Sequence, residues 1–191
     1  MLRVYLALLG LVALERLVEL GISRRNARRA LQQGGVELGR GHFPAMAALH
    51  AGFLAACAAE VVLAHRPFVP ALGYPMLALA LLAQTLRYWA IASLGRSWNV
   101  RVIVVPGAPA VTGGPYRFMR HPNYLAVVVE GFALPLVHGA WLTALGFTLL
   151  NAWLLVVRIR CEERALAAHC RGAEDLEHRF RFWPRLKLED P

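Results

Sequence analysis

The residues best suited to chemistry lie in one stretch, TGGPYRFMRHPNYLAVVVE, at residues 112–130. Its Gly-Gly-Pro sequence predicts a turn, and Pro122 suits the first turn of a helix because its missing N–H would be unpaired there. Four polar side chains lie between these signals: Tyr116, Arg117, Arg120 and His121. A helix N-terminus offers free N–H donors and partial positive charge, so this loop could bind a polar or anionic group. The alternative is a belt of Arg and Tyr that only anchors the helix at a membrane interface.

A second candidate is RIRCEERAL at residues 158–166. Arg158 and Glu162 are four residues apart and would share one face of a helix, with Glu163 beside them. The alternative is an ordinary surface ion pair. The three cysteines have no metal-ligand spacing, and there is no His-Glu-x-x-His, no Cys-x-x-Cys and no nucleotide-binding glycine loop in the sequence. Nothing in the sequence therefore suggests a metal site.

Arg87 is the third candidate, because it lies inside the apolar run 69–94. An arginine within a membrane helix costs about 2.5–3.5 kcal/mol on insertion scales, so it should face the bundle interior or a wet cavity and have a partner. One interpretation is a structural pair with Glu130, or an arginine that extends to the interface. The other is a functional contact with an anionic acceptor, because a guanidinium is always charged and fork-shaped.

The elements that must position these residues follow from hydropathy. The chain has 191 residues, of which 58% are hydrophobic, and its apolar residues form long runs typical of membrane helices. We predict an all-α integral membrane protein of one domain, residues 1–191, with a basic surface helix that follows the first span and ends at Gly34-Gly35. The five predicted spans are residues 2–22, 44–64, 69–94, 122–137 and 141–157. The segments 95–121 and 158–191 would lie in the cytosol and complete the site.

Charge gives the expected orientation. The net charge of +9 comes mostly from arginine, and in so apolar a chain it favours anionic lipids over nucleic acid as the partner. Most arginines fall on one side of the predicted spans, which places the N-terminus outside and the C-terminus in the cytosol. Glu15 and Glu19 would lie near the cytosolic interface and orient the first helix. Trp98 would mark the interface, and Trp183 would lie on the membrane surface.

These motifs carry a family resemblance. GPYRFMRHPNY, followed after one apolar hairpin by RIRCEERAL, resembles the isoprenylcysteine carboxyl methyltransferase family, integral-membrane enzymes that use S-adenosyl-L-methionine. The resemblance runs from about residue 77 to the C-terminus. The earlier segments ERLVELGISRRN and GHFPAMAALH resemble a bacterial branch that methylates long-chain alkylpyrones or alkylresorcinols and is found beside polyketide synthases. The resemblance implies an enzyme of the bacterial inner membrane with its active site facing the cytosol, a lipophilic acceptor, and a polyketide synthase as pathway neighbour.

The resemblance also implies roles for individual residues. Glu162 would bind the amino acid or ribose end of the methyl donor, and Arg87 and Arg158 would act in catalysis at the acceptor. Ala108 replaces a polar side chain common in the family, so only its backbone could serve there. The implied donor contacts are Ala108, Val111, Tyr116, His121, Pro122, Asn123, Tyr124, Glu162 and Glu163.

Other functions remain open at this point. Related membrane folds include phospholipid N-methyltransferases and NADPH-dependent reductases, and a non-enzymatic adaptor or transporter subunit would place Arg87 and Glu130 along a through-path. Methyl transfer to oxygen requires alignment and an acceptor oxygen that is deprotonated. A carboxylate or a vinylogous acid arrives almost ready, so the sequence need not supply a strong base. His50 lies within the second predicted span, where a lone histidine is more often structural.

Overall fold

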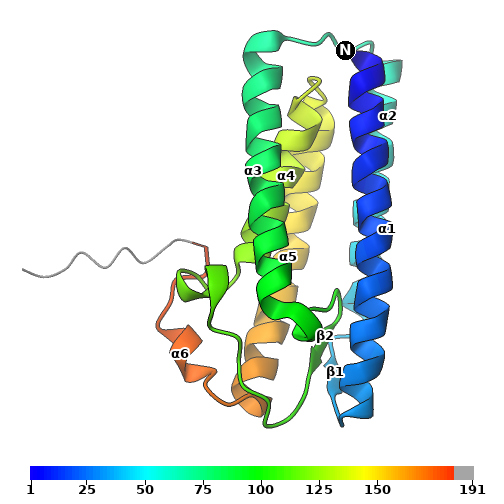
Figure 1. Ribbon diagram of the computed structural model, residues 1–191. Coiled ribbons are helices and arrows are strands. Elements are labelled where there is room, and N and C mark those ends of the chain that lie inside the picture. The colour runs from blue at the N-terminus through cyan, green and yellow to red at the C-terminus, as the bar shows by residue number, and fades with distance from the viewer. Residues whose placement is uncertain (183–191) are drawn as a thin grey trace, which may run out of the picture.

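The computed structural model describes residues 1–182, and within them it leaves out the side chains of His42 and Glu177. Five long helices form an upright bundle (Figure 1). The strands, the short helices and the longest connections gather at one end, here called the loop end; the other is the Met1 end. The elements are α1 (Leu2–Gln32), β1 (Val36–Leu38), α2 (His42–Leu63), α3 (Pro70–Leu94), η1 (Gly95–Ser97), β2 (Val102–Val104), η2 (Gly114–Arg117), α4 (Pro122–Leu136), α5 (Trp141–His169) and α6 (Glu174–Glu177). The prediction for Trp183 falls outside the described residues.

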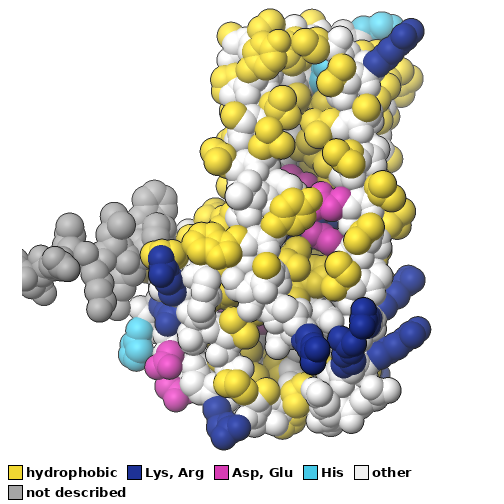
Figure 2. All heavy atoms as spheres, viewed as in Figure 1, with side chains coloured by type: hydrophobic (Ala, Val, Ile, Leu, Met, Phe, Trp, Pro, Cys, Tyr) yellow, Lys and Arg dark blue, Asp and Glu magenta, His cyan; other side chains and the backbone are white. Residues whose placement is uncertain are grey.

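Three helical segments are long and apolar enough to cross a membrane: Phe43–Leu63, Pro70–Ser97 and Trp141–His169. They coincide with three of the five predicted spans. The fourth apolar helix, α4, is shorter at 15 residues, and α1 carries acidic and basic residues in its apolar half. Apolar side chains cover the bundle in Figure 2, whereas most of the visible arginines gather at the loop end.

Local sequence sets several of the helix ends. Pro70 and Pro122 occupy the first turns of α3 and α4, where the missing N–H costs no hydrogen bond. The predicted basic surface helix is wrong as a separate element, because α1 continues without a break to Gln32. The last predicted span, 141–157, continues as one helix to His169 in α5. After Gly172 the chain forms only the single turn α6.

A small antiparallel sheet departs from the all-α prediction. Val36 pairs with Val104, and Leu38 pairs with Val102. Alternate residues of a strand point to opposite faces, so Ile103 packs against α1 while Val102 and Val104 pack against Ala165 of α5. The β-branched run therefore ties the ends of α1 and α5 together at the loop end.

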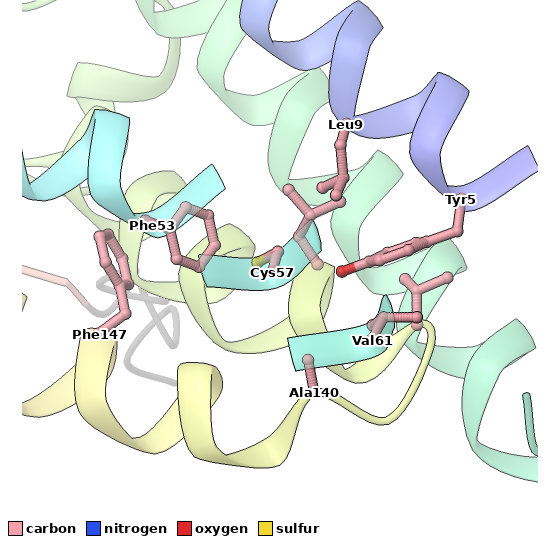
Figure 3. Close-up of a cluster of buried hydrophobic side chains, with 9 residues drawn as sticks. Tyr5, Leu9, Phe53, Cys57, Val61, Ala140 and Phe147 are labelled. Atoms are coloured by element: carbon pink, nitrogen blue, oxygen red, sulfur yellow. The ribbon is translucent and has the colours of Figure 1, made fainter. Parts of the chain in front are cut away.

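The Met1 end is held by an apolar core, which Figure 3 shows in close-up. Tyr5 of α1, Cys57 of α2 and Ala140 before α5 are buried in it. The ring pair Phe53 and Phe147, whose centroids are 4.1 Å apart, lies at the left edge of the cluster in this view. This core joins α1 and α2 to the turn between α4 and α5, and it closes the bundle at this end.

Candidate active site

The loop before α4 is held by close contacts with α3 and with the chain after α6. Gly114 has a positive φ of 58°, and a Cβ there would overlap the side chain of Ser93 on α3. Backbone N–H groups of Arg120 and His121 donate to the carbonyls of Phe180 and Arg181, each at 3.0 Å. The segment at residues 179–181 thus lies across the loop and fixes its path.

A cavity of about 240 Å³ lies between this loop, the 95–111 connection and the last turns of α5. We call it the loop cavity. Of the predicted donor contacts, all but Pro122 and Glu163 line it, together with Arg158: Ala108, Val111, Tyr116, His121, Asn123, Tyr124 and Glu162. The structure therefore brings together residues that are up to 54 positions apart in the sequence, between Ala108 and Glu162.

Arg158, Tyr124 and Glu162 form a chain of hydrogen bonds. Arg158 Nε donates to the Tyr124 hydroxyl at 2.7 Å, and that hydroxyl donates to Glu162 Oε2. Only 5% of Arg158 is exposed, so the alternative of a surface ion pair is wrong. Burial, with the nearby Glu162 carboxylate, raises the pKa of the Tyr116 hydroxyl. Tyr116 therefore stays protonated at neutral pH and can donate a hydrogen bond.

Two of the predicted donor residues are occupied elsewhere. Glu163 does not line the loop cavity; it accepts hydrogen bonds from Arg181 at 2.6 and 2.9 Å and lies 3.1 Å from His121 Nε2. Its role in the structure is to hold the segment at residues 179–181 that lies across the loop. The backbone of Ala108 is also engaged, with its N–H bonded to Val105 and its carbonyl to Arg171. Val111, the next predicted donor contact along the chain, has no such backbone bond among the described residues.

A second cavity, of about 150 Å³, lies between the helices, and we call it the bundle cavity. Its lining includes Arg16, Glu19, His50 and Arg87. A recess of about 20 Å³ continues it towards the Met1 end and stops at Phe53 and Phe147. The bundle cavity and the loop cavity share five lining residues, here called the shared wall: Trp98, Asn99, Asn123, Tyr124 and Arg158.

The shared wall collects polar atoms without partners. Asn99 Nδ2, Asn123 Oδ1 and Arg158 Nη1 are three of the seven buried side-chain polar atoms that lack a hydrogen bond in the described part of the chain. Leaving such an atom unpaired costs about 1–3 kcal/mol, so their convergence favours a ligand that supplies the partners. Trp98 is only 2% exposed, so its predicted role as an interface marker is wrong.

Arg87 is paired, but not with the predicted partner. Its Nε and Nη2 donate to the two oxygens of Glu19 at 2.7 and 2.5 Å. Glu130 instead accepts from Arg16 Nη2 at 2.7 Å, and Arg16 Nη1 reaches Glu19 at 2.9 Å. The prediction that Glu19 only orients α1 near the interface is therefore also wrong. Hydropathy shows that these charges must be neutralised inside the bundle, but it cannot assign the pairs.

The same charges bridge the seam between α1 and α3. Gln84 of α3 donates to Glu15 of α1, one turn from the Arg87–Glu19 pair. The side chains of Glu15 and Arg16 remain 17% and 19% exposed. Figure 2 shows acidic side chains in a hollow between the apolar surfaces of α1 and α3. Polar groups at the centre of the bundle are therefore reachable from its apolar side face.

Comparison with known proteins points to a family of membrane enzymes. The model of the isoprenylcysteine carboxyl methyltransferase family matches residues 76–168, which contain the shared wall and most of the loop cavity. Over this segment, just under half of its length, the chain is similar to this family. It is also 39% identical over 160 residues to "Uncharacterized protein YpbQ" of Bacillus subtilis (strain 168), across 83% of this chain and 94% of that protein. The family match indicates a membrane methyltransferase. The residues that α1 and α2 contribute to the bundle cavity precede the match.

Proposed function

We propose that this protein transfers the methyl group of S-adenosyl-L-methionine to an oxygen of a lipid-like acceptor. The observation that carries the proposal is the shared wall, where the loop cavity and the bundle cavity adjoin and three buried polar atoms lack a partner among the described residues. The loop cavity would take the donor and the bundle cavity the head of the acceptor. Family members generally use this donor.

The loop cavity has the groups that such a donor requires. The Glu162 carboxylate can bind an ammonium group or ribose hydroxyls, the Tyr116 hydroxyl can donate, and the Val111 backbone is free to bind. When bound, the donor supplies an electrophilic methyl group. The charge-assisted Glu162–Tyr124 hydrogen bond keeps the carboxylate in place before binding.

At the acceptor side, Arg158 Nη1 and Asn99 Nδ2 are two buried donors of the shared wall that lack a partner in the described part of the chain. We propose that they hold the acceptor oxygen, because a pair of fixed donors aligns the oxygen and stabilises negative charge on it. Two nitrogens of Arg87, Nε and Nη2, are bonded to Glu19, so we propose that Arg87 supports the cavity rather than acting in catalysis as predicted. The recess ends against Phe53 and Phe147, a geometry that favours a binding cavity over a through-path.

The acceptor class and topology belong to the same proposal. We propose a long-chain alkylpyrone or alkylresorcinol hydroxyl, with an isoprenylcysteine-type carboxylate as the alternative, and a polyketide synthase as pathway neighbour. The acceptor's chain would leave through the α1–α3 seam into the lipid. We further propose one membrane domain with five spans in the bacterial inner membrane and the loop end in the cytosol. The arginines gathered at the loop end support that orientation.

The test is donor binding by a matched pair of variants. Calorimetric titration of the purified protein with S-adenosylhomocysteine should show binding, and Glu162→Gln should weaken it at least tenfold. Glu174→Gln is the control, because Glu174 is an exposed glutamate on α6 outside the loop cavity. Equal affinity in Glu162→Gln and in the unaltered protein would contradict the donor site.

A further inference from the structure

His50 on α2 lines the bundle cavity, and one of its ring nitrogens is left without a hydrogen bond to the described residues. Its Nδ1 lies 2.9 Å from the carbonyl oxygen of Met46. A carbonyl can only accept, so Nδ1 carries the proton, and in the neutral ring Nε2 is then a bare acceptor. The ring also meets Phe147 edge-on, with centroids 5.3 Å apart at 89°. Two independent contacts therefore fix the ring, while Nε2 has no partner among the described residues.

The location of His50 connects it to the reaction site. It lines the bundle cavity, which extends to Tyr124 and Arg158 of the shared wall, and also the recess beyond. Val127, one turn along α4 from Tyr124, lines both of these spaces with it. A polar head that rests on the shared wall can thus face Nε2, either directly or through one water molecule.

The cations nearest to His50 are already neutralised. Arg87 is bonded twice to Glu19, and Arg16 is bonded to Glu130. With Glu15 included, the network holds three carboxylates and two guanidinium groups. This network therefore offers no free positive charge to an ionised head group, and the remaining cation of the described cavity lining is Arg158 on the shared wall. The network favours an acceptor that arrives neutral, and a neutral hydroxyl must lose its proton before or during methylation.

We propose that His50 is the proton acceptor for a weakly acidic hydroxyl, a phenol or an enol, on the lipid acceptor. The inference rests on the proposed function and assigns a further residue to it. The O–H bond breaks, the proton joins the Nε2 lone pair, and the oxygen keeps the bonding electrons. The resulting anion is held by Arg158 and Asn99, and the imidazolium returns its proton to solvent as the product leaves.

The pH dependence follows from the groups around the ring. Across the bundle cavity and its recess it faces Arg16 and Glu19 of α1, Arg87 of α3, Tyr124 and Glu130 of α4, and Arg158 of α5; its ring contact on α5 is the apolar Phe147. Arg16, Glu19, Arg87 and Glu130 are joined in ion pairs, and Arg158 is bonded to Tyr124. His50 is therefore the group of this cavity expected to change its protonation on the acid side of neutrality. Turnover of a hydroxyl acceptor should therefore fall on the acid side of neutrality, where the imidazole takes up a proton.

The first experiment observes the proton directly. A long-chain alkyl 4-nitrophenol, whose phenolate absorbs in the visible range, is titrated with pH in the presence of the protein and S-adenosylhomocysteine. Bound to the unaltered protein, the probe should ionise at a lower pH than when bound to His50→Gln, by one pH unit or more. His65→Gln is the control, because His65 is an exposed histidine in the α2–α3 turn. Identical titrations in the unaltered protein and His50→Gln would overturn the proposal.

The second experiment separates a proton acceptor from a structural histidine. Removing a general base typically costs 10²–10⁴-fold, so His50→Gln should turn over an alkylresorcinol about 100-fold more slowly. The same preparation should methylate a nitro-substituted, more acidic alkylphenol within about fivefold of the unaltered rate, which also shows that it is folded. An equal loss with both acceptors would overturn the role of His50. Failure of the unaltered protein to bind S-adenosylhomocysteine or to methylate any lipid would instead contradict the proposed function.

Discussion

Two clusters of glutamate and arginine lie in the bundle, and they are built differently. At the Met1 end, Glu60 accepts hydrogen bonds from the backbone N–H groups of Leu142 and Thr143 and from the Thr143 hydroxyl, at 2.7–3.2 Å. Arg66 pairs with the same carboxylate at 3.0 Å and lies over the Trp141 ring. Glu60 thus caps the first turn of α5, and both of its oxygens are used for that purpose.

The central cluster caps no helix. Arg16, Glu19, Arg87 and Glu130 bind one another across three helices through side chains alone. The first three line the bundle cavity, and Glu130 lines its recess. Burying such pairs is costly compared with apolar packing, so a structural purpose alone explains them poorly. The comparison shows that residue type alone does not distinguish a structural ion pair from a functional site. The distinction lies in whether the partners are backbone groups at a helix end or side chains that line a cavity.

The largest expected effect comes from breaking the central cluster on one side. Arg87→Leu leaves Glu19 buried without its bidentate partner, a loss of about 3–5 kcal/mol by analogy with soluble proteins. The thermal unfolding temperature in detergent should fall well below that of the unaltered protein.

Second-site changes identify the partner of Arg87. Arg87→Leu/Glu19→Leu should recover the unfolding temperature. Arg87→Leu/Glu130→Leu should not, because Glu19 still lacks its bidentate partner and Arg16 loses its bond to Glu130. Recovery by the Glu130 change instead would show that the observed pairing is wrong. Turnover by the recovered double mutant then measures what Arg87 does for the acceptor beyond stability.

The Met1-end cluster should respond less, and without functional change. Glu60→Gln weakens the cap on α5 and the Arg66 pair, with an expected loss of about 1–2 kcal/mol, as for other helix caps. Affinity for S-adenosylhomocysteine, measured by calorimetry, should be unchanged. A large drop in donor affinity would mean that this end of α5 is coupled to the loop cavity, contrary to the purely structural role of Glu60.

The sequence predicted much of the site because the relevant signals are local. The turn before Pro122, the helix that follows, and the shared helix face of Arg158 and Glu162 all depend on residues a few positions apart. Residues of both segments line the loop cavity; the resemblance, rather than spacing, indicated that they would share a site. Whether these residues bind a methyl donor stays a prediction.

What the sequence could not predict depends on contacts between distant segments. Glu19 and Glu130 were both available to Arg87, and hydropathy cannot show which helix lies opposite. The β1–β2 pairing joins two three-residue strands that are more than 60 positions apart, too short for a period-2 pattern to stand out. His50 was interpreted as structural because its significance comes from a cavity formed by other helices.

The recess offers a test of intermediate size. Phe147 packs directly on Gly131, where a Cβ would overlap its ring. Gly131→Ala should push the ring that closes the recess and orients His50, with an overpacking loss of about 1–3 kcal/mol. Turnover should fall severalfold while donor affinity is unchanged. Gly146→Ala is the control on α5, since its Cβ would have nothing within 4 Å. An equal effect of that change would show that the loss in Gly131→Ala does not come from overpacking against Phe147.

The smallest effect is expected in thiol labelling, which extends the comparison to the cysteines. Cys57 is fully buried in the Met1-end core, whereas Cys170 is partly exposed and lines the loop cavity. Burial raises the pKa of the Cys170 thiol above its ordinary value, so its thiolate fraction and its rate of reaction with a maleimide should keep rising through alkaline pH. In the Cys161→Ser background, which removes the other partly exposed thiol, S-adenosylhomocysteine should slow Cys170 labelling severalfold. Cys57 should stay unlabelled until the protein unfolds. Because the donor would cover Cys170 without changing its ionisation, protection should be the same at pH 7.5 and pH 9; the absence of protection at both would mean that the loop cavity is not where the donor binds.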